Sequence, residues 1–164
     1  VRSSAASDVY KRQFIIRILF KLVSAPDTVK KTAAQMDISG LNLLLVEDNE
    51  LNAEIAKTLL SDEGANLTVA EDGLQAVRMF QEKPEGYFDA ILMDIMMPVM
   101  DGLTATKTIR SLKHPDAETI PIIAMTANAF REDKEKCLVV GMNAHLAKPV
   151  KIENVKKILC EYSV

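Results

Sequence analysis

The feature that most constrains the fold is a regular alternation of short apolar runs with helical stretches, which begins at Leu41. The apolar runs are LNLLLV, NLTVA, FDAILM, IPIIAM and AHLA. Runs of this length that alternate with helices are typical of βα units, and five of them predict a parallel sheet covered by helices on both faces. Because crossovers are right-handed, the pattern favours an α/β, flavodoxin-like, doubly wound five-stranded sheet of order 2-1-3-4-5.

The first and last predicted helices, over residues 50–62 and 151–162, each carry one apolar face. The side chains that define these faces are Leu51, Ile55 and Leu59 in the first helix, and Ile152, Val155, Leu159 and Tyr162 in the last. Gly64 and Gly141 stand where the end of a helix needs a residue free to adopt positive φ. Asp72 and Asp101 are predicted to cap the starts of two further helices.

Composition excludes several classes of function. The net charge of −3 is small and of the wrong sign for a protein that binds nucleic acid through general electrostatics. The apolar segment 14–23 is too short to span a bilayer and is interrupted by Arg17 and Lys21, so we expect no membrane segment. Cys137 and Cys160 fit no metal-ligand spacing and are expected to be reduced.

The N-terminal part of the chain differs from the rest. Residues 3–13 read as an in-frame translation of a transposase-type sequencing adapter, so we treat residues 1–13 as a non-native tail. Residues 14–40 contain one alternating strand pattern followed by a polar linker, and a lone strand is not stable by itself. Residues 41–164 form the domain that carries the regular pattern.

Polar side chains stand at the carboxyl ends of four predicted strands, where ligands bind in doubly wound sheets. The strand ends are marked by Glu47 and Asp48 for the first, Asp94 for the third, Thr126 for the fourth and Lys148 for the fifth. Three carboxylates held close together repel one another, so they should bind a divalent cation or hold a proton. Oxygen-only ligands favour Mg²⁺ or Mn²⁺ over Zn²⁺. A metal ion and a lysine facing one carboxylate are suited to gathering phosphoryl oxygens, and the carboxylate of Asp94 is then a candidate nucleophile.

Four separated motifs, LLLVEDNELN, AILMDIMMPVMDG, IIAMTANAF and HLAKP, resemble the receiver domain of two-component response regulators. They are most similar to receivers joined to hybrid histidine kinases, and the resemblance covers residues 41–163. It implies that Asp94 accepts a phosphoryl group from a phosphohistidine, that Asp48 and Asp94 bind Mg²⁺ directly, that Glu47 binds it through water, and that the Met96 carbonyl completes the set. Met96 and Asn128 would tune the lifetime of the phosphoryl group.

The same resemblance assigns a switch. It implies that the Thr126 hydroxyl and the Lys148 ammonium bind phosphoryl oxygens, and that the Lys148–Pro149 peptide is cis. The family usually has Tyr or Phe three residues before this lysine, and it rotates inward when the threonine moves. This chain has His145 there. Either the imidazole serves as a weaker rotating switch, or it faces solvent and has no role.

The resemblance also sets expectations for the context of the domain. Segment 14–22 resembles the last strand of the ATP-binding domain of a histidine kinase, so the chain is similar to the C-terminal end of a hybrid kinase without its catalytic residues. The expected partners are a histidine kinase core or a histidine phosphotransfer protein. The expected location is cytoplasmic, with a parent kinase that can be membrane-anchored. Because the chain ends soon after Lys148, we expect output to pass to another protein.

Three other functions compete with this interpretation. A receiver that only docks and is never phosphorylated would not need the full set of acids, threonine and lysine. A phosphatase of the haloacid dehalogenase kind would need an acid two residues after the nucleophile, where this chain has Met96. A flavin- or nucleotide-binding protein would need a Gly-rich loop after the first strand, but EDNELN is acidic and would repel phosphates.

Overall fold

The computed structural model describes residues 37–127 and 131–162. The tail predicted over residues 1–13 and the strand predicted from Phe14 lie outside these residues. The strands are β1 (Asn42–Val46), β2 (Asn66–Ala70), β3 (Ala90–Asp94), β4 (Ile122–Thr126) and β5 (Ala144–Ala147). The helices are α1 (Glu50–Asp62), α2 (Gly73–Glu82), α3 (Gly102–Ser111), α4 (Arg131–Val139) and α5 (Ile152–Tyr162), with a short 3₁₀ helix η2 (Pro115–Ala117).

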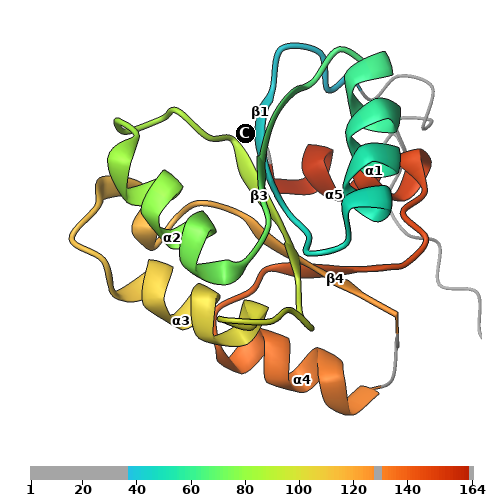
Figure 1. Ribbon diagram of the computed structural model, residues 1–164. Helices are drawn as coiled ribbons and strands as arrows, with labels where there is room; N and C mark the ends of the chain where they lie inside the picture. Colours follow the sequence, from blue (N-terminus) through green and yellow to red (C-terminus); the bar gives the residue numbers. More distant parts are fainter. Residues whose placement is uncertain (1–36, 128–130, 163–164) are drawn as a thin grey trace, which may run out of the picture. The chain divides into compact units, whose positions relative to one another are not determined.

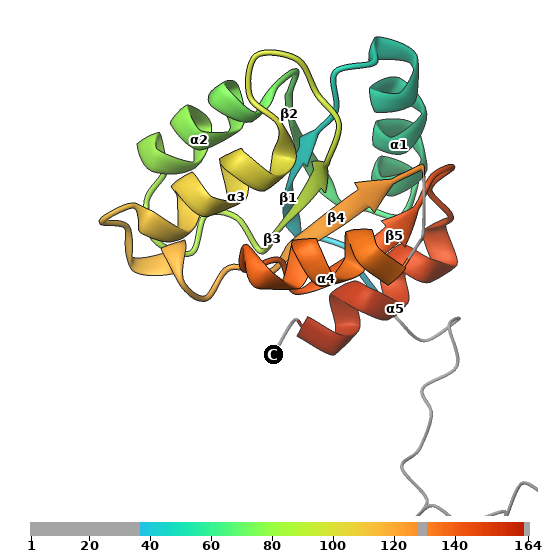
Figure 2. The ribbon, with the colours of Figure 1, turned by 90° about the horizontal axis from the view of Figure 1, so that it is seen from below.

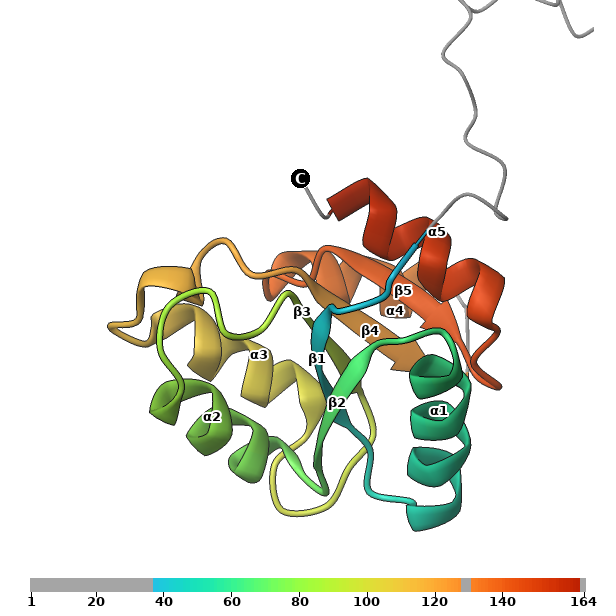
Figure 3. The ribbon, with the colours of Figure 1, turned by 90° about the horizontal axis from the view of Figure 1, so that it is seen from above.

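The strands form one parallel sheet of order β2-β1-β3-β4-β5, so the predicted flavodoxin-like topology is confirmed (Figure 1 shows the fold, and Figure 2 labels all of these strands). Helices α1 and α5 cover one face of the sheet, and α2, α3 and α4 cover the other (Figures 2 and 3). No helix in the described part of the chain combines the length and the apolar character needed to cross a membrane.

The core consists of two layers separated by the sheet. In β1, Leu43 and Leu45 pack toward α1 and α5, whereas Leu44 and Val46 pack toward the helices of the opposite face. This alternation follows from the two-residue period of a strand. Every residue of β3 and β4 is buried, because helices cover both faces of the central strands and leave no solvated side.

The predicted apolar face of α1 is wrong. Leu51, Ile55 and Leu59 are exposed, with relative accessibilities of 68%, 51% and 37%. The residues of α1 that pack on the sheet are Ala53, Ala56 and Leu60. This second series also has helical spacing, and its small alanines allow the helix to lie close to the strands. Leu51, Ile55 and Leu59 therefore form an exposed apolar stripe on α1.

The predicted apolar face of α5 is confirmed for Val155 and Leu159, which are fully buried, and Ile152 is partly buried against the same core. Tyr162 is exposed, with 37% relative accessibility, so its predicted place on this face is wrong. Gly64 and Gly141 have φ values of +86° and +97°, as expected for residues that follow helices.

Aspartate side chains start α2 and α3, as predicted. The Asp72 carboxylate accepts a hydrogen bond from the Gln75 backbone N–H at 2.8 Å, and Asp101 accepts one from the Thr104 N–H at 2.8 Å. The bond from Thr104 lowers the pKa of Asp101 below its ordinary value, because it stabilises the charged form. The position of α3 matters for the site because this helix follows directly from the loop after Asp94.

Arg110 holds the C-terminal end of α3 in place through hydrogen bonds to backbone carbonyls and one amide side chain. Its guanidinium donates to the carbonyls of Gly141 at 3.0 Å, Ala117 at 2.8 Å and Ile120 at 2.8 Å, and to the Asn143 side-chain oxygen at 2.9 Å. These bonds join α3 to the segment before β4 and to the turn before β5. The loops at the amino ends of the strands are thus held together, which leaves the carboxyl ends for the site.

Candidate functional site

The carboxyl edge of the sheet brings together the side chains that the sequence singled out. Glu47 follows β1, Asp94 ends β3 and Thr126 ends β4, and these strands are direct neighbours. Lys148 follows β5, which pairs with β4 through Thr126 and Ala147. Because all strands are parallel, their carboxyl ends lie at the same edge of the sheet (Figure 2).

Three carboxylates form the acidic part of the site. Single oxygen atoms of Glu47, Asp48 and Asp94 all lie within 4.8 Å of one another. Asp48 is exposed, but Glu47 and Asp94 have relative accessibilities of only 4% and 5%. Buried carboxylates are costly to desolvate unless a positive charge compensates them. Three converging oxygen ligands, one of them open to solvent, fit a hard divalent cation such as Mg²⁺.

Lys148 supplies a positive charge to the same carboxylates. Its ammonium nitrogen lies 2.5 Å from Glu47 Oε2 and 2.6 Å from Asp94 Oδ2. Burial alone would lower the pKa of Lys148, but the hydrogen bonds and charges of Asp94 and Glu47 outweigh burial, and the pKa is raised above its ordinary value. Lys148 is therefore charged at neutral pH and bridges the two buried acids. Asn52 donates to the remaining oxygen of Glu47 at 2.9 Å.

The loop after β3 adds backbone groups beside Asp94. The Met96 N–H donates to Asp94 Oδ1 at 3.2 Å, which places the Met96 backbone next to the acids. The Met96 side chain points outward, with 80% relative accessibility. The role of the Met96 carbonyl as a metal ligand stays a prediction.

The predicted switch residues have different positions. Thr126 is nearly buried at the end of β4, and its carbonyl accepts the Lys148 N–H at 2.8 Å. His145 is half-buried and pairs with Ala124, two residues before Thr126, so it lies below the edge that carries the acids. The Lys148–Pro149 peptide bond is cis, as the resemblance implied. The predicted lifetime residue Asn128 lies outside the described residues.

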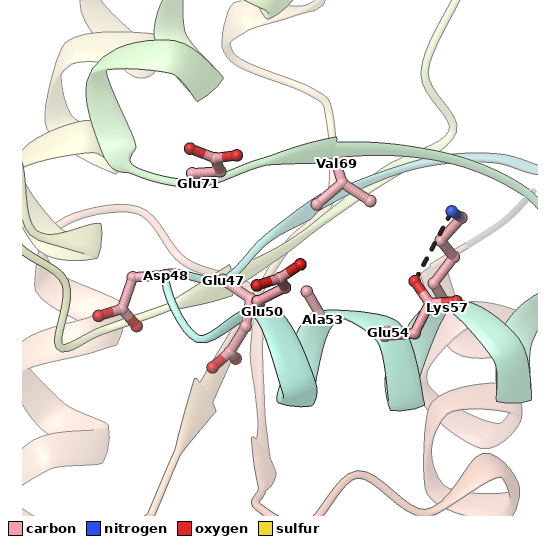
Figure 4. A pocket seen from close by; sticks show the side chains of 8 residues that line it. All are labelled: Glu47, Asp48, Glu50, Ala53, Glu54, Lys57, Val69 and Glu71. Atoms are coloured by element: carbon pink, nitrogen blue, oxygen red, sulfur yellow. Dashed lines mark ion pairs between the residues drawn. The ribbon is translucent and has the colours of Figure 1, made fainter.

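An acidic cleft of about 460 Å³ extends from the site between α1 and β2 (Figure 4). Glu50 of α1 lies across this cleft from Glu71, which follows β2. Glu54 forms an exposed ion pair with Lys57, at 3.8 Å. Glu50, Glu54 and Glu71 were not predicted to lie near the site. The sequence did contain one indication of the two α1 residues. Glu50 and Glu54 are four residues apart, which places both on one side of the helix.

A second cleft, of about 340 Å³, opens on the other side of the site. It is lined by Ile55 of α1 together with Lys148, Pro149 and Val150. The cleft is mainly apolar and is continuous with the exposed apolar stripe through Ile55. This cleft was not predicted, because the apolar pattern of α1 favours a core position for Ile55.

Comparison with known proteins agrees with this geometry. The sequence model of the response regulator receiver domain matches residues 43–160. A curated relative, "Hybrid signal transduction histidine kinase B" of Dictyostelium discoideum, is 40% identical in an alignment 139 residues long, which covers 79% of this chain and 7% of the relative. The chain spans 7% to 16% of the length of the first curated relatives that it matches.

Two solved structures are also similar. The receiver domain of sensor histidine kinase PA1611 from Pseudomonas aeruginosa PAO1, described with a magnesium ion in its active site cleft, is 43% identical with a TM-score of 0.67. The match covers 76% of this chain and 98% of that domain. The second structure is the Saccharomyces cerevisiae complex of the histidine phosphotransfer protein Ypd1 with the receiver domain of Ssk1. The matching chain in it is 30% identical with a TM-score of 0.66, and the match covers 77% of this chain and 90% of that chain.

Proposed function

Because the chain belongs to the response regulator receiver domain family, we propose that its Asp94 carboxylate accepts a phosphoryl group from a phosphohistidine in a two-component phosphorelay. The observation that carries this assignment is the convergence of three carboxylates around Asp94, with the Lys148 ammonium 2.6 Å from its Oδ2. An acceptor aspartate needs both features, because the incoming phosphoryl group is anionic and would otherwise be repelled.

The chemistry is an in-line transfer. An oxygen of Asp94 attacks the phosphorus, an O–P bond forms, and the P–N bond to the histidine breaks with its electron pair remaining on the imidazole nitrogen. The Lys148 ammonium leaves Asp94 Oδ2 to hold a phosphoryl oxygen, and the Thr126 hydroxyl binds another. The movement of Thr126 passes the change to the rest of the fold, with His145 as the proposed responding residue.

A divalent cation fits the acidic residues. Asp48 and Asp94 would bind it directly, Glu47 through water and Met96 through its backbone carbonyl. When bound, Mg²⁺ neutralises charge on the phosphoryl oxygens, and Mn²⁺ has ligand preferences that allow it to substitute. The exposed position of Asp48 leaves a route for the ion to enter.

The direct test uses a small phosphodonor. In Mg²⁺ and acetyl phosphate, the purified chain is expected to gain the mass of one phosphoryl group, as measured by intact-protein mass spectrometry. EDTA should prevent the gain, because the acids then lack the cation that neutralises them. A chain that binds Mg²⁺ but never gains mass would contradict the acceptor role and favour a receiver that only docks.

We propose that the donor protein docks on the apolar stripe of α1. The stripe borders the site through Ile55 and the apolar cleft, and exposed aliphatic side chains at helical spacing suit an apolar helix of a partner. The similar yeast complex contains a histidine phosphotransfer protein, which supports a partner of that class for this chain. A histidine kinase core is the second proposed donor.

Ile55→Glu is expected to lower the rate of phosphotransfer from phosphorylated Ypd1 by about tenfold or more, because a charge in an apolar docking surface must be desolvated. Labelling by acetyl phosphate should stay within twofold of the unaltered chain, since Ile55 is exposed and not part of the site. Val139→Glu, at an exposed aliphatic residue of α4, is the control. Equal loss in both variants, or no transfer from Ypd1 to the unaltered chain, would contradict docking on α1.

We infer that the parent protein is a hybrid histidine kinase, with this domain in the cytoplasm and output to another protein. The small share of the relatives that the chain spans supports a longer parent. Residues 14–40 are proposed to be the end of its ATP-binding domain and a linker, and residues 1–13 a non-native tail.

A further inference from the structure

The loop between β3 and α3, residues 95–101, closes on itself beside the acids. Where the two ends of the loop meet, the Gly102 N–H donates to the Ile95 carbonyl at 3.0 Å, and the Met96 N–H donates to Asp94 Oδ1 at 3.2 Å. A Cβ atom on Gly102 would collide with the carbonyl oxygen of Asp94. The two ends of the loop are therefore in direct contact, and a displacement at its far side is passed to the Met96 backbone.

The tip of this loop is strained. Val99 has a φ of +65°, and the Met100 N–H donates to the Pro98 carbonyl at 2.7 Å, which closes a γ-turn around Val99. Positive φ is costly for a β-branched residue. The Val99 side chain has 80% relative accessibility, so burial of this side chain does not compensate for the cost. The backbone contacts of the loop must hold the strained turn.

One of these contacts comes from α2. The N–H of Gly73, the first residue of α2, donates to the Met100 carbonyl at 3.1 Å. A Cβ atom on Gly73 would lie 2.5 Å from that carbonyl oxygen and 2.8 Å from Ala105 Cβ. The nearest obstacle is backbone, which cannot rotate away, so any larger residue at position 73 must push the loop. Glycine is needed here for space.

We infer that Gly73 and Val99 are positioning residues for the metal site, acting in opposite directions on one loop. Gly73 fastens the loop in the conformation that holds the Met96 backbone beside Asp94. The strain at Val99 opposes that conformation, so only a fraction of the metal-free chain is ready to bind the cation. The apparent affinity for Mg²⁺ is reduced by that fraction. This inference rests on the Mg²⁺ site of the proposed function.

Two substitutions should shift Mg²⁺ affinity in opposite directions. Gly73→Ala is expected to raise the Kd for Mg²⁺ about fivefold or more, because the loop is displaced from its binding-competent conformation. Val99→Asn is expected to lower the Kd about twofold to threefold, since Asn tolerates positive φ and relieves the strain. The measurement is calorimetric titration of the metal-free chain with MgCl₂, together with the Tm in EDTA.

Val139→Asn replaces an exposed valine in α4, away from the loop, and should leave the Kd unchanged. If Gly73→Ala lowers the Tm but leaves the Kd within twofold, or if Val99→Asn raises the Tm without lowering the Kd, the inference is wrong and the contacts serve packing alone. Should Gly73→Ala not fold, Val99→Asn decides the question. Failure of acetyl phosphate to label the unaltered chain would instead count against the acceptor role, which these titrations do not measure.

Discussion

Asp94→Asn is expected to lose the Mg²⁺-dependent gain of a phosphoryl group from acetyl phosphate, with the initial rate reduced on the order of 10³-fold or more. An amide is a poor nucleophile, and the substitution also removes one of the three negative charges that draw the cation into the site. The rate is measured by intact-protein mass spectrometry over time in saturating Mg²⁺.

The loss in Asp94→Asn must come from chemistry and not from unfolding. Lys148 keeps its ion pair with Glu47, at 2.5 Å, when Asp94 becomes neutral, so the fold should be retained. Asp62→Asn, at an exposed residue that ends α1, is the matched control and should be labelled at the rate of the unaltered chain. Labelling of Asp94→Asn at that same rate would place the acceptor on another side chain, which peptide mapping would then locate.

The meeting of Asp94 with Glu47 and Thr126 was predictable from the sequence because it follows from topology. Parallel strands end at one edge, and the order 2-1-3-4-5 makes β1, β3 and β4 neighbours. Each of these residues directly ends or follows a short apolar run, so little depended on side-chain detail. The fold and the location of the site were therefore predictable together.

Which face of α1 packs on the sheet was not predictable from the apolar pattern. Two series of apolar residues in this helix have helical spacing, and the larger side chains of the Leu51, Ile55 and Leu59 series gave the stronger signal. The series that packs on the sheet is the one with two alanines, because their small side chains allow the helix to lie closer to the strands. A hydrophobic pattern cannot distinguish a core face from an aliphatic stripe left in solvent, such as the one proposed here for docking.

Contacts between loops could also not be predicted from the sequence. The hydrogen bond from the Gly73 N–H to the Met100 carbonyl depends on the path of a loop whose tip has positive φ at Val99. Valine rarely adopts positive φ, so the sequence does not indicate this conformation. The ion pairs of Lys148 with both Glu47 and Asp94 could likewise not be predicted, since the sequence indicated only that the three side chains would lie near one another.

Lys148→Ala is expected to lower the free energy of unfolding of the metal-free chain by about 2–3 kcal/mol, because it leaves the buried Glu47 and Asp94 carboxylates without their cation. This value is below that of a fully buried pair, since the Lys148 side chain retains 18% relative accessibility. Urea denaturation in EDTA measures the loss. Lys57→Ala, which breaks only an exposed pair with Glu54, should change the free energy by less than about 0.5 kcal/mol.

Added Mg²⁺ should restore most of the stability that Lys148→Ala loses, because a divalent cation among the acids replaces the missing ammonium charge. The same variant should bind Mg²⁺ more tightly than the unaltered chain, since no lysine competes for Asp94. The pKa of Lys148 is raised in the folded state, so its contribution is complete below the unfolded pKa and disappears only as pH rises through the folded value. The stability difference in EDTA should accordingly be constant between about pH 6 and 9. An equal loss in EDTA and in saturating Mg²⁺ would mean that Lys148 stabilises the domain through packing, and that the ammonium and the cation do not share the charge of Asp94.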